Sequence, residues 1–558
     1  MALISGLGRT AVAVPGTRVQ ASGVRVVRGG RRVLDDVHLR VEPGRLVAVI
    51  GASGAGKTTL LDALSGVSRP TAGTVLHDGV DRSATAEPVG YLPQDDVIHR
   101  DLPLATTLHY AGRLRLPAGT ARIELRTRIG EVLEILGLSD RADVRVGSLS
   151  GGERKRAGIG VELLTRPRVF FLDEPTSGLD PVTGAGLVAT LRGLADAGTT
   201  VLFSTHHAAD VTACDEVVVL ARGGQVAFTG TPDAARAHFG VGTVEEIYTE
   251  LADERIPPTV PASNGIAAQP FRAPVPAPPR LGPARQALVL SARTADLVRR
   301  NRLTLAVLLG SPVMIVAMFL VLFRGGAFDP AAPSPSTTVM IIFWIAFGGF
   351  FFGLTYGLLQ ICTELPIVRR ERLAGVRLAP YLASKVVVLL PLLAAVDVLL
   401  LAALRLLDRL PALGGPDFAA MFLSLLLASA AALALGLLCS AVVSDAAQAT
   451  LALPMLCFPQ VLFVGAILPV PLMAPVGRWL SVAMTNRWSF EALGHGAGLA
   501  ALWRDGSSPL GPPLLASYGD SFERALWPDW TVLAGFTVLL LVAAWAVLVV
   551  RCRGDRRG

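Results

Sequence analysis

The stretch Gly51-Ala52-Ser53-Gly54-Ala55-Gly56-Lys57-Thr58-Thr59 indicates how the first half of the chain folds. It fits the pattern G-x-x-x-x-G-K-[ST], follows an apolar run typical of a buried strand (46–50) and precedes a helical pattern (60–64). In that setting, backbone N–H groups surround a β-phosphate at a helix N-terminus. We expect Lys57 to reach the β- and γ-phosphates and the Thr58 hydroxyl to bind Mg²⁺. A glycine-rich turn that only caps a helix is the alternative.

Apolar residues are distributed unevenly along the 558 residues of the chain. Up to about Ile256 charged and apolar residues are mixed as in a soluble domain, whereas repeated apolar blocks run from Leu303 to Cys552. The formal net charge of +7 includes arginine clusters beside these blocks, for example at 369–372. Arginines flank membrane spans on the cytosolic side, so the charge indicates a membrane protein and argues against a nucleic-acid partner.

A second anion-binding feature is the run Leu149-Ser150-Gly151-Gly152-Glu153-Arg154-Lys155-Arg156. It predicts a turn that opens a helix from Arg156 to Thr165, with bare backbone N–H groups at the helix start. Ser150, Gly151 and Gly152 are therefore candidate phosphate-binding residues. The alternative is that Ser150 is a plain helix cap.

Two adjacent carboxylates follow the apolar run 169–172, which predicts a strand buried on both faces. The carboxyl ends of such strands are where α/β sheets bind ligands. Asp173 can therefore hold the hydration shell of Mg²⁺, and Glu174 can orient and deprotonate an attacking water. A solvated pair of acids is the alternative.

Two more polar residues follow short apolar segments. Gln94 comes after 90–92 and can orient a water or complete a Mg²⁺ shell without adding charge. His206 follows the predicted strand 201–205 and can donate a hydrogen bond to a γ-phosphate. The alternatives are a surface glutamine and a structural histidine.

In their order and rough spacing, these motifs together with Ser177-Gly178-Leu179-Asp180 resemble the ATPase domain of ABC transporters. The resemblance implies that 51–59 is the Walker A loop and that 150–152 is the signature. It also implies two ATP molecules, each held between the Walker A loop of one subunit and the signature of the other. One copy of each motif then requires a second subunit. The implied roles of single residues are the Walker B aspartate for Asp173, the catalytic base for Glu174, the Q-loop glutamine for Gln94 and the switch histidine for His206.

The runs 60–66, 94–97 and 152–156 narrow the resemblance to G-type half-transporters, in which the ATPase precedes a six-helix membrane domain. The resemblance implies export, and it implies that 364–372 is the coupling helix that touches the ATPase domain. Many relatives place an aromatic residue that stacks on adenine where this chain has 23–29, which contains none. Nucleotide selectivity is therefore open.

The fold class that we predict is an α/β P-loop ATPase domain followed by an all-α transmembrane domain of six spans. Each apolar block of about 20 residues can cross a hydrocarbon core of ~30 Å. The spans run roughly over 304–323, 338–361, 384–404, 418–442, 447–469 and 529–550. The predicted parts are an N-terminal tail (1–16), the ATPase domain (17–250), a Pro/Ala-rich linker (251–285), an amphipathic connecting helix (286–303) and the permease domain (304–552).

Arginines in the loop after the second span and in the C-terminal tail place both termini in the cytosol, although Arg405 and Arg409 argue mildly against this. Asp397 lies well inside a span, where it should face other helices or water; it either touches substrate or fixes helix packing. Phe350, Phe351, Tyr356 and Gln460 are candidate cavity residues, with packing as the alternative.

The hypothesis is a multi-pass exporter of the plasma (cell inner) membrane, most simply a homodimer, that uses ATP and Mg²⁺. Its partners would be a second half-transporter subunit, membrane lipids and a lipid or hydrophobic substrate. The Ala/Leu/Arg-rich composition favours a bacterial origin. A membrane-embedded mechanochemical or regulatory ATPase that signals rather than transports is the alternative.

Overall fold

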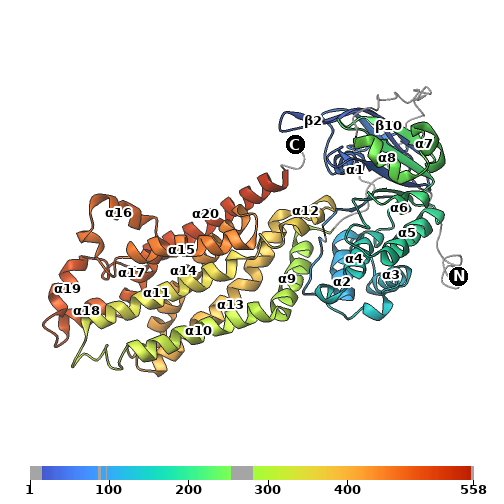
Figure 1. The fold of residues 1–558 in the computed structure, drawn as a ribbon. Helices are drawn as coiled ribbons and strands as arrows, with labels where there is room; N and C mark the ends of the chain where they lie inside the picture. Colours follow the sequence, from blue (N-terminus) through green and yellow to red (C-terminus); the bar gives the residue numbers. More distant parts are fainter. Residues whose placement is uncertain (1–15, 86–88, 96, 253–280, 554–558) are drawn as a thin grey trace. The chain divides into compact units, whose positions relative to one another are not determined.

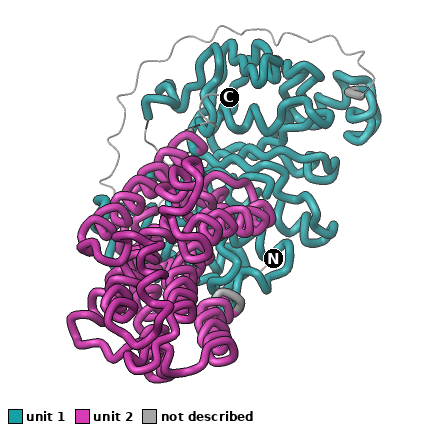
Figure 2. The backbone as a smooth tube through the Cα atoms, turned by 90° about the vertical axis from the view of Figure 1, so that its left-hand side faces the viewer, with its two compact units in different colours: residues 1–285, 369–376, 552–558 teal, residues 286–368, 377–551 magenta. Residues whose placement is uncertain are grey.

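The computed structural model describes residues 16–85, 89–95, 97–252 and 281–553. Two compact units divide the chain (Figure 2). The first contains residues 1–285, 369–376 and 552–558, and the second contains 286–368 and 377–551. The predicted N-terminal tail and most of the predicted linker lie outside the described residues.

A six-stranded sheet forms the centre of the first unit. Its neighbouring strands are parallel, except that the edge strand β10 runs antiparallel to β9. All residues of β3, β7 and β8 are buried, as expected for strands covered on both faces. In spatial order the strands are β10 (Val226–Gly230), β9 (Glu216–Leu220), β3 (Leu46–Gly51), β8 (Thr200–Ser204), β7 (Val169–Leu172) and β6 (Gly90–Leu92).

A second, antiparallel sheet packs on the same unit. Strand β3 contributes side chains to two hydrophobic cores, because alternate side chains of a strand point to opposite faces of the sheet. Leu46, Ala48 and Ile50 belong to one core, and Val47 and Val49 to the other, which also contains residues of the second sheet. The second sheet has the order β2 (Arg31–Val41), β1 (Val19–Arg28), β4 (Ala72–His77) and β5 (Val80–Asp81).

The helices of the first unit include one whose start differs from the prediction. Helix α4 begins at Gly151, not at Arg156. The reason is a capping box, in which the Ser150 Oγ accepts from the Glu153 N (3.2 Å) and the Glu153 Oε2 accepts from the Ser150 N (2.9 Å). These helices are α1 (Lys57–Ser65), α2 (Leu104–Arg115), α3 (Arg122–Ile135), α4 (Gly151–Leu163), α5 (Pro181–Asp196), α6 (Ala208–Thr212), α7 (Pro232–Phe239) and α8 (Val244–Ala252).

The second unit is helical, and its long helices lie side by side (Figure 1). Helix α14 packs along α11, and the Arg551 guanidinium donates to the Ala441 and Val442 carbonyls at the end of α14 (2.9 and 3.0 Å). Four short helices, α16 to α19, gather at one end. The helices are α9 (Pro283–Arg300), α10 (Arg302–Leu322), α11 (Pro335–Leu358), α13 (Leu378–Leu406), α14 (Gly415–Val442), α15 (Ala446–Leu462), α16 (Pro475–Val482), α17 (Thr485–Gly496), α18 (Leu499–Asp505), α19 (Gly511–Tyr518) and α20 (Leu526–Arg553). Helix α12 (Leu365–Leu373) begins in the second unit, and its residues from Arg369 onward belong to the first.

Five helices in the described part of the chain are long and apolar enough to cross a membrane, namely α10, α11, α13, α14 and α20. The predicted span 447–469 corresponds to the shorter α15, which has 17 residues and ends at Leu462. Pro454 and Pro459 lie inside α15, and each removes a backbone donor from the helix. The structure therefore shows full-length helices for five of the six predicted spans and a shorter apolar helix for the fifth.

His77 lies at the end of β4 in the core of the first unit. Its Nε2 is 2.9 Å from the Leu64 carbonyl, and its ring stacks on Phe171 at a centroid distance of 6.3 Å. Burial, together with the nearby Arg82 charge, lowers the pKa of His77 from 6.5 to about 3. The imidazole is therefore neutral at pH 7, and its Nε2 donates to the carbonyl.

We expect acid to destabilise the first unit through His77. Between pH 6.5 and about 3 the unfolded chain binds a proton that the folded chain does not, so the contribution of His77 to stability is complete above pH 6.5. It falls by about 1.4 kcal/mol for each pH unit below that value. Thermal unfolding in detergent at pH 7 and pH 5 should show a larger loss for the wild type than for His77→Gln, which keeps a donor but does not titrate. Equal losses would contradict the assignment.

Candidate nucleotide site

The strand order brings four separated motifs to one edge of the sheet. Strands β3, β8, β7 and β6 are parallel neighbours, so their carboxyl ends lie side by side. The loop 51–59 follows β3, His206 follows β8, Asp173 and Glu174 follow β7, and Gln94 follows β6. This edge is where open α/β sheets bind their ligands.

The phosphate-binding loop ends at the N-terminus of α1. Gly56 caps that helix at φ 101°, and a Cβ there would lie 2.9 Å from the Val33 carbonyl, so only glycine fits. Thr58 is exposed, whereas Thr59 is buried in the packing of α1. The Lys57 Nζ donates to the Gly51 and Ala52 carbonyls at 2.9 and 3.3 Å. The lysine therefore folds back over its own loop, where an anion bound by the loop would meet it.

Lys57 is partly buried and lies near two carboxylates. Burial lowers the pKa of Lys57, and the nearby Glu174 and Asp173 carboxylates oppose that effect. An ammonium group that has lost part of its hydration gains more from a phosphate partner than a solvated one does. Because both carboxylates act on the pKa of Lys57, the lysine and the two acids lie close enough to interact.

Ser204, which belongs to none of the predicted site motifs, positions both acids. The Ser204 Oγ donates to the Asp173 Oδ1 at 2.6 Å and accepts from the Glu174 N at 2.8 Å. Asp173 is buried, while the Glu174 side chain is 21% exposed and its backbone has φ 44°. A non-glycine residue in this region stores strain, and such residues cluster at functional sites. Ser204 thus fixes the direction in which Glu174 points.

Gln94 and His206 meet at the same oxygen of Glu174. The Gln94 Nε2 donates to the Glu174 Oε2 at 3.1 Å, and the His206 Nδ1 lies 3.6 Å from that oxygen. Three of the predicted residues, which are far apart in the sequence, are therefore brought together. Their arrangement can hold a water between a carboxylate, an amide and an imidazole.

The donor set suits Mg²⁺, which prefers oxygen ligands and keeps several waters. The Thr58 hydroxyl is exposed at the start of α1, the Asp173 carboxylate lies at the end of β7, and the Gln94 side chain provides an amide oxygen. One hydroxyl, one carboxylate and one amide leave room for substrate oxygens and water. The residues fit the metal, which would neutralise charge on the phosphates when bound.

The run Ser150-Gly151-Gly152 is not joined to the phosphate loop. Among the described residues, no hydrogen bond or ion pair connects 150–152 with 51–59. Ser150 serves as the helix cap of α4, and the α4 residue Lys155 instead donates to the Gln94 carbonyl. Helix α4 is therefore tied to the Gln94 loop.

A buried ion-pair cluster connects residues 369–376 with the rest of the first unit. Glu162 on α4 lies between Arg115 (2.7 Å) and Arg370 (2.6 Å), and all three side chains are less than 10% exposed. Arg370 also donates to the Val97 carbonyl at 2.8 Å and to the Gly158 carbonyl at 3.0 Å. Burial raises the pKa of Glu162, but Arg115 and Arg370 outweigh it and hold the pKa below its usual range. Glu162 is therefore a carboxylate, and Arg370 reaches the loop that carries Gln94.

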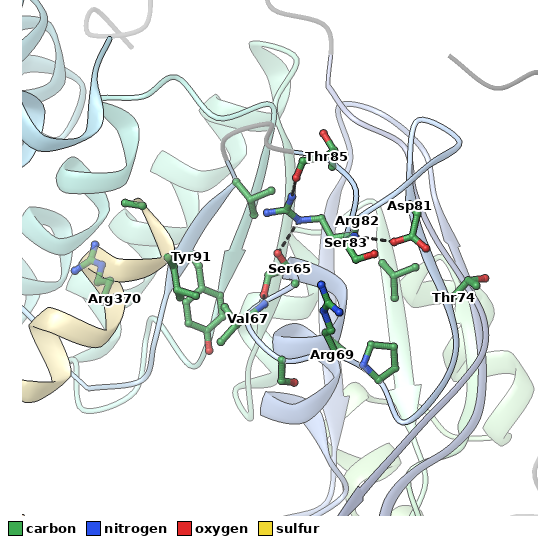
Figure 3. Close-up of a pocket in the computed structure, with 18 of the residues that line it drawn as sticks. Ser65, Val67, Arg69, Thr74, Asp81, Arg82, Ser83, Thr85, Tyr91 and Arg370 are labelled. Atoms are coloured by element: carbon green, nitrogen blue, oxygen red, sulfur yellow. Dashed lines mark hydrogen bonds between the residues drawn. The ribbon is translucent and has the colours of Figure 1, made fainter. Parts of the chain in front are cut away.

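A cavity of about 490 Å³ lies beside this cluster (Figure 3). Arg370 and Tyr91 are among its lining residues, and no residue of 51–59 is. The Arg82 guanidinium is held by the Ser65 carbonyl at 2.9 Å and by the Thr85 carbonyl at 3.0 Å (Figure 3). This cavity is therefore separate from the nucleotide site.

Three of the four candidate cavity residues are buried inside the second unit. Phe350, Tyr356 and Gln460 are each no more than 5% exposed. The Tyr356 hydroxyl donates to the Leu308 carbonyl (2.8 Å), and the Gln460 Oε1 accepts from the Asn486 N (2.9 Å). Tyr356 and Gln460 are thus held by contacts within the unit, whereas Phe351 is partly exposed.

Asp397 is fully buried in α13, and among the described residues neither carboxylate oxygen has a hydrogen-bond partner. Its neighbour Ser429 on α14 donates instead to the Gly349 carbonyl of α11 at 3.2 Å. Helices α11 and α14 are in close contact at Gly349, since a Cβ added there would lie 2.4 Å from the Leu425 side chain. Asp397 therefore faces packed helices.

We expect Asp397→Leu to leave the fold intact and to stabilise it by about 1–3 kcal/mol, because it keeps the branched shape and leaves no unpaired polar atom in the helix contact. Thermal unfolding in detergent measures this. Asp417→Asn, at an exposed position in the first turn of α14, is the control and should change little. Unchanged thermal stability combined with lost transport would contradict a packing role and assign Asp397 to the cargo.

Residues 34–177 match the family model described as ABC transporter, and residues 285–496 match the model described as ABC-2 type transporter. The chain belongs to the ABC transporters. In this half-transporter the ATPase domain precedes the membrane domain, as the G-type resemblance predicted.

Individual relatives agree with this assignment. The ABC transporter ATP-binding/permease protein Rv1747 of Mycobacterium tuberculosis is 32% identical over 565 residues, which is 96% of this chain and 64% of that protein. ABC transporter G family member 21 of Arabidopsis thaliana is 39% identical over 39% of this chain and 34% of that protein. Bovine ABCG2, a broad substrate specificity ATP-binding cassette transporter, is 36% identical over 40% of this chain and 35% of that protein. The chain thus spans less than two thirds of each relative.

Proposed function

We propose that this half-transporter pairs with a second subunit, most simply a copy of itself, and uses ATP hydrolysis to export a lipid or hydrophobic compound across the plasma (inner) membrane. The observation that carries the proposal is the meeting of Gln94 and His206 at Glu174, beside Lys57, in a chain that also has membrane-spanning helices.

Each residue at the sheet edge has a role that follows from its position. Backbone N–H groups of 51–59 and the Lys57 ammonium would bind the phosphates of the substrate ATP. Glu174 would take a proton from the attacking water, while Gln94 and His206 orient that water and the γ-phosphate. Thr58, Asp173 and Gln94 would hold Mg²⁺, which supplies charge neutralisation on the phosphates.

The N-terminus of α4 supports pairing. The backbone N–H groups of its first residues would complete the ATP site of the other subunit, since no hydrogen bond joins 150–152 to the loop 51–59 among the described residues of their own chain. A mixed dimer tests this. Differently tagged Lys57→Ala and Gly151→Asp chains are co-expressed and purified through both tags. Gly151 tolerates a side chain, because a Cβ there would meet only Leu179 at 3.8 Å.

The mixed dimer retains one intact pair of phosphate loop and signature, so it should recover about half of the wild-type ATPase rate, whereas either variant alone should be inactive. A mixed dimer as inactive as the two parents would argue against sites shared between subunits.

Export is tested with inside-out membrane vesicles and a panel of labelled lipids and hydrophobic compounds. ATP-dependent accumulation by the wild type, absent with Glu174→Gln, is the expected result. Hydrolysis without accumulation of any compound in the panel would favour the alternative, a regulatory ATPase that signals.

A further inference from the structure

Asp210 joins two loops of the nucleotide site, although no motif marks it. It lies on the short helix α6 (Ala208–Thr212) and is 6% exposed. Its Oδ2 accepts hydrogen bonds from the Thr176 Oγ1 and from the Thr205 Oγ1, each at 2.7 Å. Both threonines are buried, at 3% and 1% exposed. One carboxylate oxygen therefore holds two side chains that are 29 positions apart in the sequence.

The two threonines belong to the loops that carry the proposed water-activating residues. Thr205 directly precedes His206, and Thr176 lies two positions after Glu174. The Thr205 hydroxyl also accepts from the His207 N at 3.0 Å, and the Thr205 N donates to the Val49 carbonyl at 3.2 Å. Thr205 thus ties the turn that presents His206 to strand β3 and to Asp210.

The segment that carries Thr176 is also held by hydrogen bonds. The Glu174 carbonyl accepts from the Ser177 N at 3.1 Å, and the Thr176 carbonyl accepts from the Leu179 N at 3.2 Å. These turns place Glu174 and Thr176 in one compact segment, so a shift of Thr176 moves Glu174. Hydrogen bonds to an ionised acceptor are stronger and shorter than those between neutral groups, and a buried carboxylate without them is costly.

We propose that Asp210 is a positioning residue for ATP hydrolysis, which keeps the His206 turn and the Glu174 turn at a fixed separation. It touches neither the nucleotide loop 51–59 nor Glu174 directly; it acts through Thr205 and Thr176. The inference rests on the proposed roles of Glu174 and His206.

The test compares valine, which has the shape of threonine but no hydroxyl, with serine, which keeps the hydroxyl. All variants are made in the full chain and assayed in detergent. Thr205→Val and Thr176→Val lose the hydrogen bond to Asp210, while Thr205→Ser and Thr176→Ser keep it. Both valine variants should lower kcat for ATP at least about tenfold, since a misplaced catalytic group costs rate rather than binding. The KM for ATP should stay within about twofold, because 51–59 is untouched, and both serine variants should restore kcat to near wild type.

Asp210→Ala adds a readout that a purely structural residue would not show. In a His206→Ala background it should lower kcat by a smaller factor than in the wild type, because one of the two groups that it positions is gone. Full, multiplicative losses in the double variant would overturn the inference, as would valine variants with wild-type kcat.

A wrong assignment of the ATP site would give a different experimental result from a wrong assignment of Asp210. If Glu174→Gln hydrolyses ATP like the wild type, the proposed site is wrong; if Glu174→Gln is inactive while both valine variants are normal, only the role of Asp210 is wrong.

Discussion

Glu174→Gln is expected to lower the rate of ATP hydrolysis by about 10²- to 10⁴-fold, the usual contribution of a general base. The side chain keeps its size, so the contact with Gln94 and the backbone turn at φ 44° can persist. ATP should still bind, because Lys57 and the loop 51–59 are unchanged. Steady-state phosphate release and equilibrium binding of labelled ATP measure the two effects separately.

The control is Glu131→Gln, which removes an exposed carboxylate from its pair with Arg166 (2.9 Å) and should leave hydrolysis unchanged. Hydrolysis by Glu174→Gln at the wild-type rate would remove Glu174 as the base. Loss of ATP binding together with hydrolysis would instead show that the substitution disturbs the phosphate site.

Arg370→Ala should separate ATP hydrolysis from transport. Arg370 lies in the segment for which the family resemblance implies a coupling helix, and it holds both the buried Glu162 and the Val97 carbonyl near Gln94. Without Arg370, Glu162 keeps only Arg115, and removal of one partner from a buried pair costs about 3–5 kcal/mol. We expect hydrolysis to continue and cargo movement to fall by more than about tenfold. A loss of about 1.4 kcal/mol in the coupling free energy between ATP hydrolysis and transport already corresponds to a tenfold fall.

The matched control is Arg236→Ala, since Arg236 pairs with Asp233 at 2.6 Å on an exposed surface. Exposed pairs contribute about 0–1 kcal/mol, so this variant should behave like the wild type in both assays. Equal losses of hydrolysis and transport in Arg370→Ala would show that Arg370 supports the fold of the ATPase unit rather than its coupling.

The α/β class of the first unit could be predicted because its signals are local. The loop 51–59 lies between a buried strand and a helix, and 169–172 is a continuous apolar run; both patterns specify their structure within a few residues. Parallel pairing then places the motifs at one edge. Nothing local shows that the Gln94 and His206 side chains meet at one oxygen of Glu174.

The remaining differences come from contacts that a sequence pattern does not contain. Glu153 returns to cap α4 through Ser150, which moves the start of that helix, and α15 ends at Leu462 although the apolar residues continue. Ser204 and Asp210 carry no motif, since their partners become visible only when β7 and β8 are paired. The partners of Arg370 are likewise set by the fold, because Glu162 is 208 positions away.

The most direct test of the account is the amount of cargo moved per ATP hydrolysed, measured in the same inside-out vesicles for wild type, Glu174→Gln and Arg370→Ala. We predict a constant ratio for the wild type across ATP concentrations, neither hydrolysis nor transport for Glu174→Gln, and hydrolysis with a much lower ratio for Arg370→Ala. Cargo movement that continues in Glu174→Gln, or that bears no relation to hydrolysis in the wild type, would contradict the claim that this chain couples ATP hydrolysis to transport.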